Sequence, residues 1–248
     1  MNYAIIIPTY NEIGNITRLL AEIQKTVTSQ KKDTFDVYII DDNSPDGTAE
    51  VVSGLAGKLN TSRFSIQLLS RKQKDGLGKA YIFGFGKVLA VGTYDYILQM
   101  DADLSHDPKY IASFLYQSRK GADFIVASRY IPGGGTPDWP WYRKFLSRGG
   151  NIYIRTFLGS AISDYTGGFN MYSAALLKKM HVDDIQSGGY GFLIELKYRA
   201  LRYAKHTAQI PIVFLDRTQG TSKIPKNILL QNFLLVPRIK FGHYIDKR

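Results

Sequence analysis

The chain has 248 residues, 44% of them hydrophobic, with a formal net charge of +11 and no cysteine. The absence of cysteine excludes disulfides, thiolate metal ligands and a cysteine nucleophile. No segment approaches the roughly 20 apolar residues of a membrane-spanning helix, and the first residues lack the features of a secretion signal. The basic excess predicts anionic partners. Phosphate-bearing ligands and a membrane surface are favoured over nucleic acid, because no nucleic-acid-binding motif accompanies the charge.

Short apolar runs alternate with amphipathic stretches in the first half of the chain. Strands are predicted at residues 4–7, 35–40, 64–70, 94–100 and 123–128. Helices are expected between them, starting at Asn15 or Thr17, near Thr48, after Gly76 and at Asp107. The alternation predicts an α/β fold, a Rossmann-like, mainly parallel sheet with helices on both faces.

Four polar clusters follow these strands, at residues 8–12, 41–48, 71–79 and 101–107. Because ligands of such sheets bind at the carboxyl ends of the strands, the clusters are expected to form one site. Loops at these ends are polar in any case, but polarity alone explains the repeated pairs of carboxylates less well.

The strongest chemical signal is the pair Asp101 and Asp103, directly after the fourth predicted strand. Residues i and i+2 of a strand point the same way, so both carboxylates are expected to face one point. Mg²⁺ and Mn²⁺ favour carboxylate oxygens and are often shared with phosphates. The alternative is a simple helix-start turn, which accounts for Asp107 and Pro108 without requiring the pair.

The alternation weakens after residue 130. A glycine-rich loop at 131–137 precedes an aromatic, basic helical stretch that includes 139–143 and 148–157, and a sharp turn is expected at 166–169. A strand is predicted at 208–214. Trp139 and Trp141 suit either a core or a membrane interface. The apolar tail at 227–241 either packs on the core or forms an amphipathic helix on a bilayer.

Seven segments resemble, in order, the family-2 inverting glycosyltransferases of GT-A fold, and among them the dolichyl- or polyprenyl-phosphate mannosyltransferases. They are PTYNE (8–12), DDNSPDGT (41–48), GLGKA (76–80), DADLSHDP (101–108), SRY (128–130), DYTGGF (164–169) and RTQGTSK (217–223). The resemblance implies a GT-A domain over residues 1–223, with a nucleotide-sugar half (1–130) and an acceptor half (131–223). An amphipathic segment, 224–248, would follow and contact a membrane surface.

The resemblance implies transfer of a hexose, with mannose from GDP-mannose as the first expectation, to a polyprenyl (dolichyl) phosphate. Mg²⁺ or Mn²⁺ would be the cofactor. The protein is expected to be peripheral on the cytoplasmic face of a membrane, with a membrane-anchoring protein as a candidate partner and no nucleic acid. One alternative is a family-2 enzyme with another donor, such as UDP-glucose, or a sugar hydroxyl acceptor. Another is a polyanion-binding protein with a degenerate enzyme fold.

The resemblance also implies roles for individual residues. The nucleoside would be held by Pro8, Tyr10, Glu12, Ile40 and Asp42. The diphosphate would meet Asp101, Ala102, Asp103, Arg129, Arg217 and Lys223. The metal would lie on Asp101, Asp103 and Ser105, and the acceptor phosphate on Arg129, Arg143 and Ser147. The catalytic set would be Asp101, Asp103, Arg129 and Arg217.

Two positions depart from the family pattern. Ser105 stands where the family often has Gln, and its shorter side chain leaves room for a water between it and a metal. Asn170 stands where the family often has Arg or Lys, so a charge is missing there. Glu195 is expected either on a helix surface or near the acceptor, and His106 is expected to be a helix-start residue.

Overall fold

The computed structural model describes residues 1–30, 32–215 and 226–241. The strands are β1 (Asn2–Thr9), β2 (Thr34–Asp41), β3 (Phe64–Ser70), β4 (Tyr96–Gln99), β5 (Phe124–Ser128), β6 (Asn170–Ser173) and β7 (Thr207–Pro211). The α-helices are α1 (Ile13–Thr28), α2 (Thr48–Leu59), α3 (Leu77–Val91), α4 (Ile111–Arg119), α5 (Trp141–Leu158), α6 (Ala174–Lys179), α7 (Tyr190–Tyr203) and α8 (Lys226–Phe241). Two short 3-10 helices are η1 (Pro108–Tyr110) and η2 (Val182–Asp184).

The strands form one sheet in the order β3-β2-β1-β4-β6-β5-β7. All pairs are parallel except those of β6, which runs antiparallel to β4 and β5. The predicted α/β fold with a mainly parallel sheet is therefore confirmed. β6 was not predicted, because its four residues, NMYS, are too few to show a strand period.

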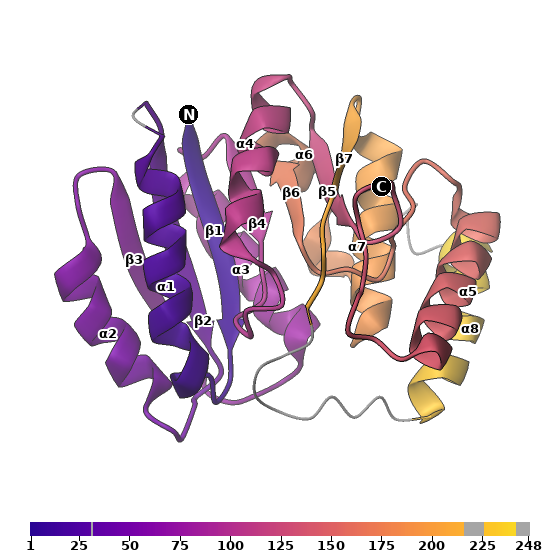
Figure 1. Ribbon diagram of the computed structural model, residues 1–248, viewed down its shortest axis with the longest axis horizontal. Helices are drawn as coiled ribbons and strands as arrows, with labels where there is room; N and C mark the ends of the chain where they lie inside the picture. Colours follow the sequence, from indigo (N-terminus) through magenta and orange to yellow (C-terminus); the bar gives the residue numbers. More distant parts are fainter. Residues whose placement is uncertain (31, 216–225, 242–248) are drawn as a thin grey trace.

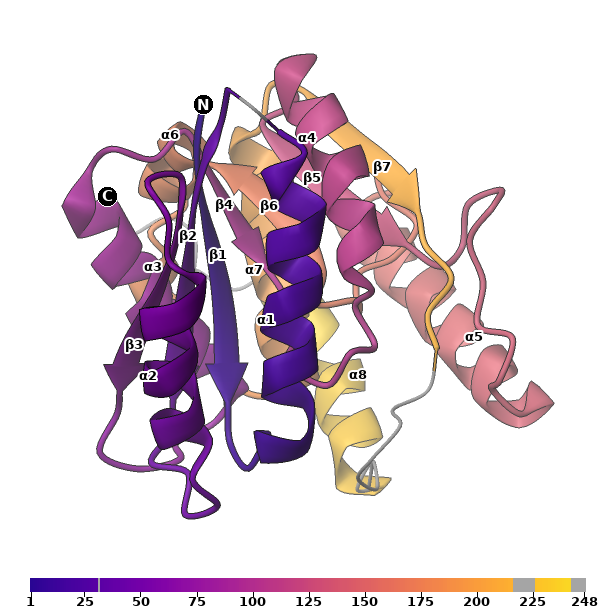
Figure 2. The ribbon, with the colours of Figure 1, turned by 60° about the vertical axis from the view of Figure 1, so that its left-hand side comes forward.

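Helices cover both faces of the sheet, as expected. α1, α2 and α4 lie on the near face in Figure 1, and Figure 2 shows α1 and α2 on the same side of the strands. Side chains alternate along β1, so Tyr3, Ile5 and Ile7 pack with α1 and α4, whereas Ala4 and Ile6 pack with α3 and α7. The sheet therefore separates two hydrophobic cores.

α3 approaches β1 closely at Gly84. A Cβ atom at this position would lie 2.7 Å from Cγ2 of Ile6, closer than side chains tolerate. Glycine is therefore required for this contact, which brings the amino end of α3 toward the edge of the sheet where β4 ends.

α8 packs against α5 and α7 with Val236 and Ile239 buried, while Leu234 and Phe241 remain exposed. The described part of this helix therefore contacts the core, one of the two expectations for the tail. Within residues 1–30, 32–215 and 226–241, no helix has the length and apolarity needed to cross a bilayer.

Three boundaries differ from prediction. α1 begins at Ile13 with Glu12 as its N-cap, before both expected starts. The helical stretch predicted from Trp139 forms α5, which begins only at Trp141, after Pro140 as its N-cap. β4 ends at Gln99, so Asp101 and Asp103 lie in a bend, and strand alternation does not determine their orientation.

Candidate active site

The carboxyl ends of β1, β2, β3, β4 and β5 lie at one edge of the sheet, because these strands run in the same direction. The loops that leave them carry the four predicted polar clusters. The expectation that these clusters meet at one edge is confirmed.

The loops after β1 and β2 are tied together by Asp41. Its carboxylate accepts hydrogen bonds from Thr9 Oγ1 at 3.0 Å, Ser44 Oγ at 2.6 Å and Ser44 N at 2.9 Å. Asp46 in the same loop accepts hydrogen bonds from the backbone N–H groups of Ile13 and Thr48. These bonds hold the two loops and the start of α1 in one rigid arrangement.

Asp42, a predicted nucleoside ligand, is buried beside Arg71, with 2.8 Å between Oδ1 and Nη1. Burial raises the pKa of Asp42, and the Arg71 charge opposes that effect. Tyr10 is exposed on the neighbouring loop, where the Lys74 ammonium lies 4.0 Å from the centre of its ring. An aromatic ring, a carboxylate and two cations therefore border this part of the edge.

The other predicted nucleoside residues differ in accessibility. Pro8 and Glu12 are half-buried at the end of β1 and the start of α1. Ile40 is fully buried between the sheet and α3. The structure therefore leaves no exposed surface on Ile40 for a ligand.

Asp101 is held by two residues that the sequence did not assign to the site. Tyr81 donates its hydroxyl to Oδ1 at 2.8 Å. The backbone N–H of Asp101 donates to Nδ1 of His106 at 2.9 Å. With Nδ1 an acceptor, the ring proton lies on Nε2, which is 3.8 Å from Oδ2 of Asp101. Tyr81 therefore orients the carboxylate of Asp101, and His106 holds its backbone.

His106 is buried and stacks on Phe169, with 4.8 Å between ring centres. Burial lowers its pKa, so the ring is neutral. His106 directly precedes Asp107, the N-cap of η1, as a residue at a helix start would, and its contact with Asp101 was not predicted. The one available signal was its place inside the DADLSHDP segment.

Asp103 is only 6% exposed, and its Oδ1 accepts hydrogen bonds from the backbone N–H and the hydroxyl of Ser105 at 3.1 and 2.5 Å. Ser105 therefore orients Asp103. Ala102 between the two aspartates is buried. Leu104 has a φ of 62°, which turns the chain back after Asp103.

The donor atoms of this bend suit a hard divalent cation. Two carboxylates are present, and the side chain of Asp101 is 28% exposed. Mg²⁺ and Mn²⁺ prefer such oxygen ligands and complete their shells with phosphate and water. Among the described residues there is no cluster of three or more His, Asp or Glu side chains that would hold a metal without such additional ligands.

The turn at residues 166–169 lies directly against the aspartate bend. A Cβ atom on Gly168 would lie 3.2 Å from Oδ2 of Asp101 and 3.3 Å from Cε1 of His106. The absence of a side chain at Gly168 therefore allows this approach. The same turn begins at Asp164, which couples the aspartate bend to a second charged group.

That second group is a buried ion pair between Arg129, after β5, and Asp164. Nε and Nη2 of Arg129 donate to the two carboxylate oxygens at 2.7 and 2.8 Å, and both side chains are buried. Burial alone would raise the pKa of Asp164, but the charge and hydrogen bonds of Arg129 outweigh it and hold that pKa below its ordinary value. The guanidinium is fixed in one orientation.

Lys197, on α7, joins this pair from the interior. Its side chain is fully buried, and Nζ donates to the backbone carbonyl of Asp164 at 2.6 Å. Burial lowers the pKa of Lys197 to about 7, against the opposing attraction of Asp164. Periodicity did not reveal it, because a lysine inside a helix is ordinarily expected at the surface.

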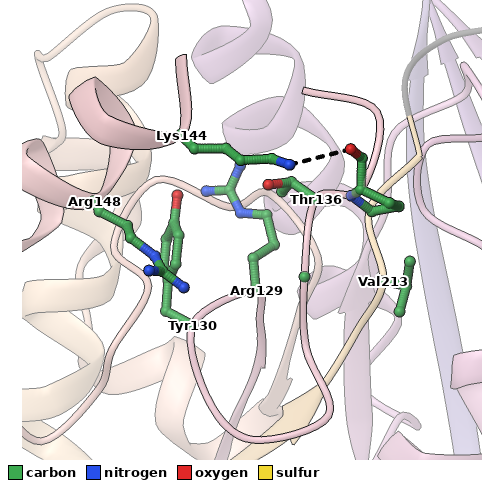
Figure 3. Close-up of a pocket in the computed structure, with 8 residues that line it drawn as sticks. Arg129, Tyr130, Thr136, Lys144, Arg148 and Val213 are labelled. Atoms are coloured by element: carbon green, nitrogen blue, oxygen red, sulfur yellow. Dashed lines mark hydrogen bonds between the residues drawn. The ribbon is translucent and has the colours of Figure 1, made fainter. Parts of the chain in front are cut away.

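A pocket of about 400 Å³ lies beside Arg129. Figure 3 shows the side chains of Arg129, Lys144 and Arg148 reaching toward it from two segments of the chain. Tyr130 lines the same pocket, and its hydroxyl is 2.6 Å from Oγ of Ser147. Three cations around one small space indicate an anion site.

The predicted acceptor residues are only partly in this pocket. Arg129 lines it, and Ser147 contacts it through Tyr130. Arg143 lies over the ring of Trp139 at 3.9 Å and is not among the lining residues. Lys144 and Arg148 were missed, although two basic residues four apart on one helix share a face.

Glu195 is not on a helix surface. It is 3% exposed, accepts a hydrogen bond from Ser187 Oγ at 2.6 Å and pairs with Arg199 at 2.8 Å. Asn170 is buried in β6 and donates to Gln99 and to the backbone carbonyl of Gly167. The predicted phosphate ligands Arg217 and Lys223 lie outside the described residues.

Solved structures share this fold. Glucosyl-3-phosphoglycerate synthase from Mycobacterium tuberculosis, in a complex with Mn²⁺, UDP and glucosyl-3-phosphoglycerate, aligns over 96% of this chain and 78% of its own, with a TM-score of 0.61 and 18% identity. The same enzyme with Mn²⁺, UDP-glucose and phosphoglyceric acid aligns over 98% and 79%, with a TM-score of 0.62 and 17% identity. The GT-A type of fold is therefore confirmed.

Two characterised proteins are more similar in sequence. An undecaprenyl-phosphate mannosyltransferase of Micrococcus luteus is 37% identical over 96% of this chain and 93% of its own length. A polyprenol monophosphomannose synthase of Mycolicibacterium smegmatis is 36% identical over 89% and 80%. The glycosyl transferase family 2 model matches residues 4–180. On these matches, which agree with the sheet-edge site, the chain belongs to glycosyl transferase family 2.

Proposed function

We propose that this family-2 glycosyltransferase transfers mannose from GDP-mannose to a polyprenyl phosphate, with inversion and with Mg²⁺ or Mn²⁺. The observation that carries the proposal is the cationic pocket beside the buried Arg129–Asp164 pair, at the sheet edge where the aspartate bend lies. The two relatives whose names specify a mannosyltransferase of a polyprenyl-type phosphate support this choice of sugar and acceptor.

The donor is assigned to the loops after β1, β2 and β4. Tyr10 and Asp42 border the nucleoside end, with Pro8, Glu12 and the buried Ile40 beside them. Asp101 and Asp103 face the diphosphate, and Ala102 lies between them. A divalent ion bound to these carboxylates supplies Lewis-acid stabilisation of the charge that develops on the leaving diphosphate.

Three residues position the proposed metal ligands. Tyr81 and His106 fix Asp101, while Ser105 fixes one oxygen of Asp103. Ser105 acts in this assignment through Asp103 or through a water on the metal, which agrees with its short side chain. The site is organised before the donor binds, so little reorganisation is needed during the reaction.

The acceptor phosphate is assigned to the pocket lined by Arg129, Lys144 and Arg148. Ser147 contacts Tyr130 of the pocket wall, and Arg143 lies over Trp139 outside the lining. A phosphate oxygen of the acceptor attacks the anomeric carbon of the mannose and forms the new C–O bond. The bond between that carbon and the β-phosphate oxygen of GDP breaks. The electron pair of that bond leaves with GDP. The nucleophile enters opposite to the leaving group, so the configuration inverts.

The acceptor oxygen is already anionic at neutral pH, and no strong general base is required. The main task is to align two anions that repel each other. The buried Arg129 has its orientation set by Asp164 and lies beside the acceptor pocket, and we assign Arg217 and Lys223 to the leaving phosphates. Together with the aspartate-bound cation, these groups screen both anions.

The proposed assignment extends to the whole chain. Residues 1–223 form the GT-A domain, with its nucleotide-sugar half in 1–130 and its acceptor half in 131–223, and residues 224–248 are assigned to a membrane-surface segment. A lipid acceptor requires the enzyme to act at a membrane, and we place it on the cytoplasmic face. A separate anchoring protein would be compatible with this placement.

The experiment is an assay of lipid product with GDP-mannose or UDP-glucose as donor and polyprenyl phosphate as acceptor, with and without a chelator. We expect mannosylated lipid with GDP-mannose and not with UDP-glucose, and we expect no product once the chelator removes the metal. Product from UDP-glucose but not GDP-mannose would contradict the donor assignment, and full activity with chelator would contradict the role of Asp101 and Asp103.

The alternative acceptor, a sugar hydroxyl, requires a carboxylate base. Glu195 was the candidate, but its oxygens are bound by Ser187 and Arg199. We therefore expect Glu195→Gln to retain transfer to polyprenyl phosphate while lowering thermal stability, since it disturbs a buried ion pair. Loss of transfer in a folded Glu195→Gln variant would favour the alternative.

A further inference from the structure

Helix α5 carries large apolar side chains that no other segment of the described chain covers. Trp141, Phe145 and Ile152 are 79, 71 and 61% exposed. Their spacing of four and seven residues places them on one face of the helix. Tyr142 and Leu146, also exposed, extend this face. These five side chains are here called the apolar stripe of α5.

The buried side of α5 is different. Asn151, Ile154 and Leu158 are turned to the core, and Ile154 and Leu158 belong to the hydrophobic cluster behind the sheet. The apolar stripe is therefore not needed to hold the helix on the protein. A run of exposed aromatic residues of this kind marks an interaction surface.

A basic row runs beside the apolar stripe. Lys144, Arg148 and Arg155 repeat the spacing of Trp141, Phe145 and Ile152, so the two rows are parallel along the helix. Lys144 and Arg148 also line the pocket beside Arg129. The basic row therefore lies between the apolar stripe and the proposed phosphate site.

We propose that the apolar stripe of α5 enters the interfacial layer of an anionic lipid bilayer and thereby brings the pocket to the level of the lipid phosphates. The proposal rests on the proposed function, since it deepens the acceptor assignment. A helix with aromatic residues on one side and Lys and Arg along its edge has the composition of helices that lie in the bilayer interface.

Charge supports a bilayer as the occupant. The basic row matches the negative potential of anionic lipid headgroups, and each cation near such a surface strengthens binding. α8, which packs on α5, adds the exposed Leu234 and Phe241 together with the exposed cations Arg238 and Lys240. The combination of apolar and basic groups therefore continues onto the neighbouring helix.

The experiment measures sedimentation of the full chain with vesicles of phosphatidylcholine alone or with phosphatidylglycerol. The Trp141→Ser/Phe145→Ser variant is compared with Tyr116→Ser, which removes an aromatic side chain of similar exposure on α4. We expect the wild type and Tyr116→Ser to bind anionic vesicles in a salt-sensitive manner. The double variant should bind at least about 10-fold more weakly, because it loses the two most exposed apolar side chains of the stripe.

A second readout separates this inference from the proposed function. The double variant should keep wild-type transfer to a short isoprenyl phosphate dissolved in water, and lose transfer to polyprenyl phosphate in vesicles. A wild type that sediments with neither vesicle, or a double variant that binds as tightly as the wild type, overturns the inference. Vesicle binding as expected, with no transfer to either acceptor, leaves the inference standing and contradicts the proposed function.

Discussion

Arg129 belongs both to the buried ion pair with Asp164 and to the lining of the cationic pocket. Its guanidinium donates two hydrogen bonds to the Asp164 carboxylate. The side chain is buried but still lines the pocket. Asp164 therefore fixes the orientation of the Arg129 guanidinium, which is a preorganised hydrogen-bond donor rather than a mobile surface cation. Such a group stabilises developing charge without having to reorganise.

The first prediction concerns this geometry. Arg129→Lys keeps the charge but loses the planar fork, and we expect transfer to fall about 100-fold, by comparison with the loss of one preorganised charge-stabilising donor. Arg148→Lys, at an exposed position of the same pocket, serves as the matched control and should retain most activity. Rates are measured on lipid product, with circular dichroism to verify folding. Equal rates for the two variants would contradict the role of Arg129.

The second prediction concerns Lys197. Because burial lowers its pKa to about 7, the unfolded chain, with an ordinary lysine pKa near 10.4, binds more protons than the folded protein between those values. The free energy of unfolding contributed by this group therefore rises with pH from about 7 to 10, by up to about 1.4 kcal/mol per pH unit. Lys197→Met should remove that slope.

The measurement is urea unfolding of wild type and variant at pH 6 to 9.5, and the difference between the two curves isolates Lys197. Lys179→Met, on the exposed side of α6, is the control and should follow the wild type. Parallel curves for wild type and Lys197→Met would show that folding does not lower the pKa of Lys197, and would contradict this prediction.

Some of this residue-level organisation was visible in the sequence and some was not. Asp101, Asp103 and Arg129 lie in recognisable segments and reach the sheet edge as expected. His106, Lys144 and Lys197 were not assigned, because their roles come from contacts across 5 to 33 residues of chain or from a shared helix face. Such contacts are set by tertiary packing, which local pattern does not encode.

The turn before β6 brings the aspartate bend close to the Arg129–Asp164 ion pair. The turn begins at Asp164, passes Gly168 against Asp101, and enters β6 between β4 and β5. A short antiparallel strand in a parallel sheet thus fixes the distance between the aspartate bend and Arg129. The turn was expected from its glycines, but the strand that anchors it was not, because four residues carry no period.

The third prediction tests that contact. Gly168→Ala places a methyl group 3.2 Å from Oδ2 of Asp101, so the carboxylate must shift by a few tenths of an ångström. We expect metal-dependent GDP binding to weaken about 10-fold, which corresponds to about 1.4 kcal/mol, with little loss of stability. Calorimetric titration with GDP and Mn²⁺ provides the measurement.

Gly86→Ala is the matched control, because a Cβ at Gly86 meets open space on α3. That variant should bind GDP as the wild type does and gain about 0.5–1 kcal/mol of stability from its helix position. Unchanged binding in Gly168→Ala would show that the turn does not constrain Asp101.

The whole molecule separates the two proposed substrates along one sheet edge. The aspartate bend and the Asp42 region lie at the end of β4 and β2, and the cationic pocket lies beside β5 and α5. The net charge of +11 is consistent with this division, since both proposed substrates are phosphates. The composition indicated anionic partners. The structure shows where Arg129, Lys144 and Arg148 come together, in the pocket beside β5 and α5.

The central claim is that Asp101 and Asp103 hold a divalent cation that binds the leaving diphosphate. The most direct measurement is the thermal shift produced by GDP with and without Mn²⁺, for the wild type and for Asp103→Asn. A ligand at 100 times its Kd stabilises the native state by about 2.7 kcal/mol. The account predicts a clear GDP shift in the wild type that requires Mn²⁺ and is lost in Asp103→Asn. An equal GDP shift without Mn²⁺, or an unchanged shift in Asp103→Asn, would contradict it.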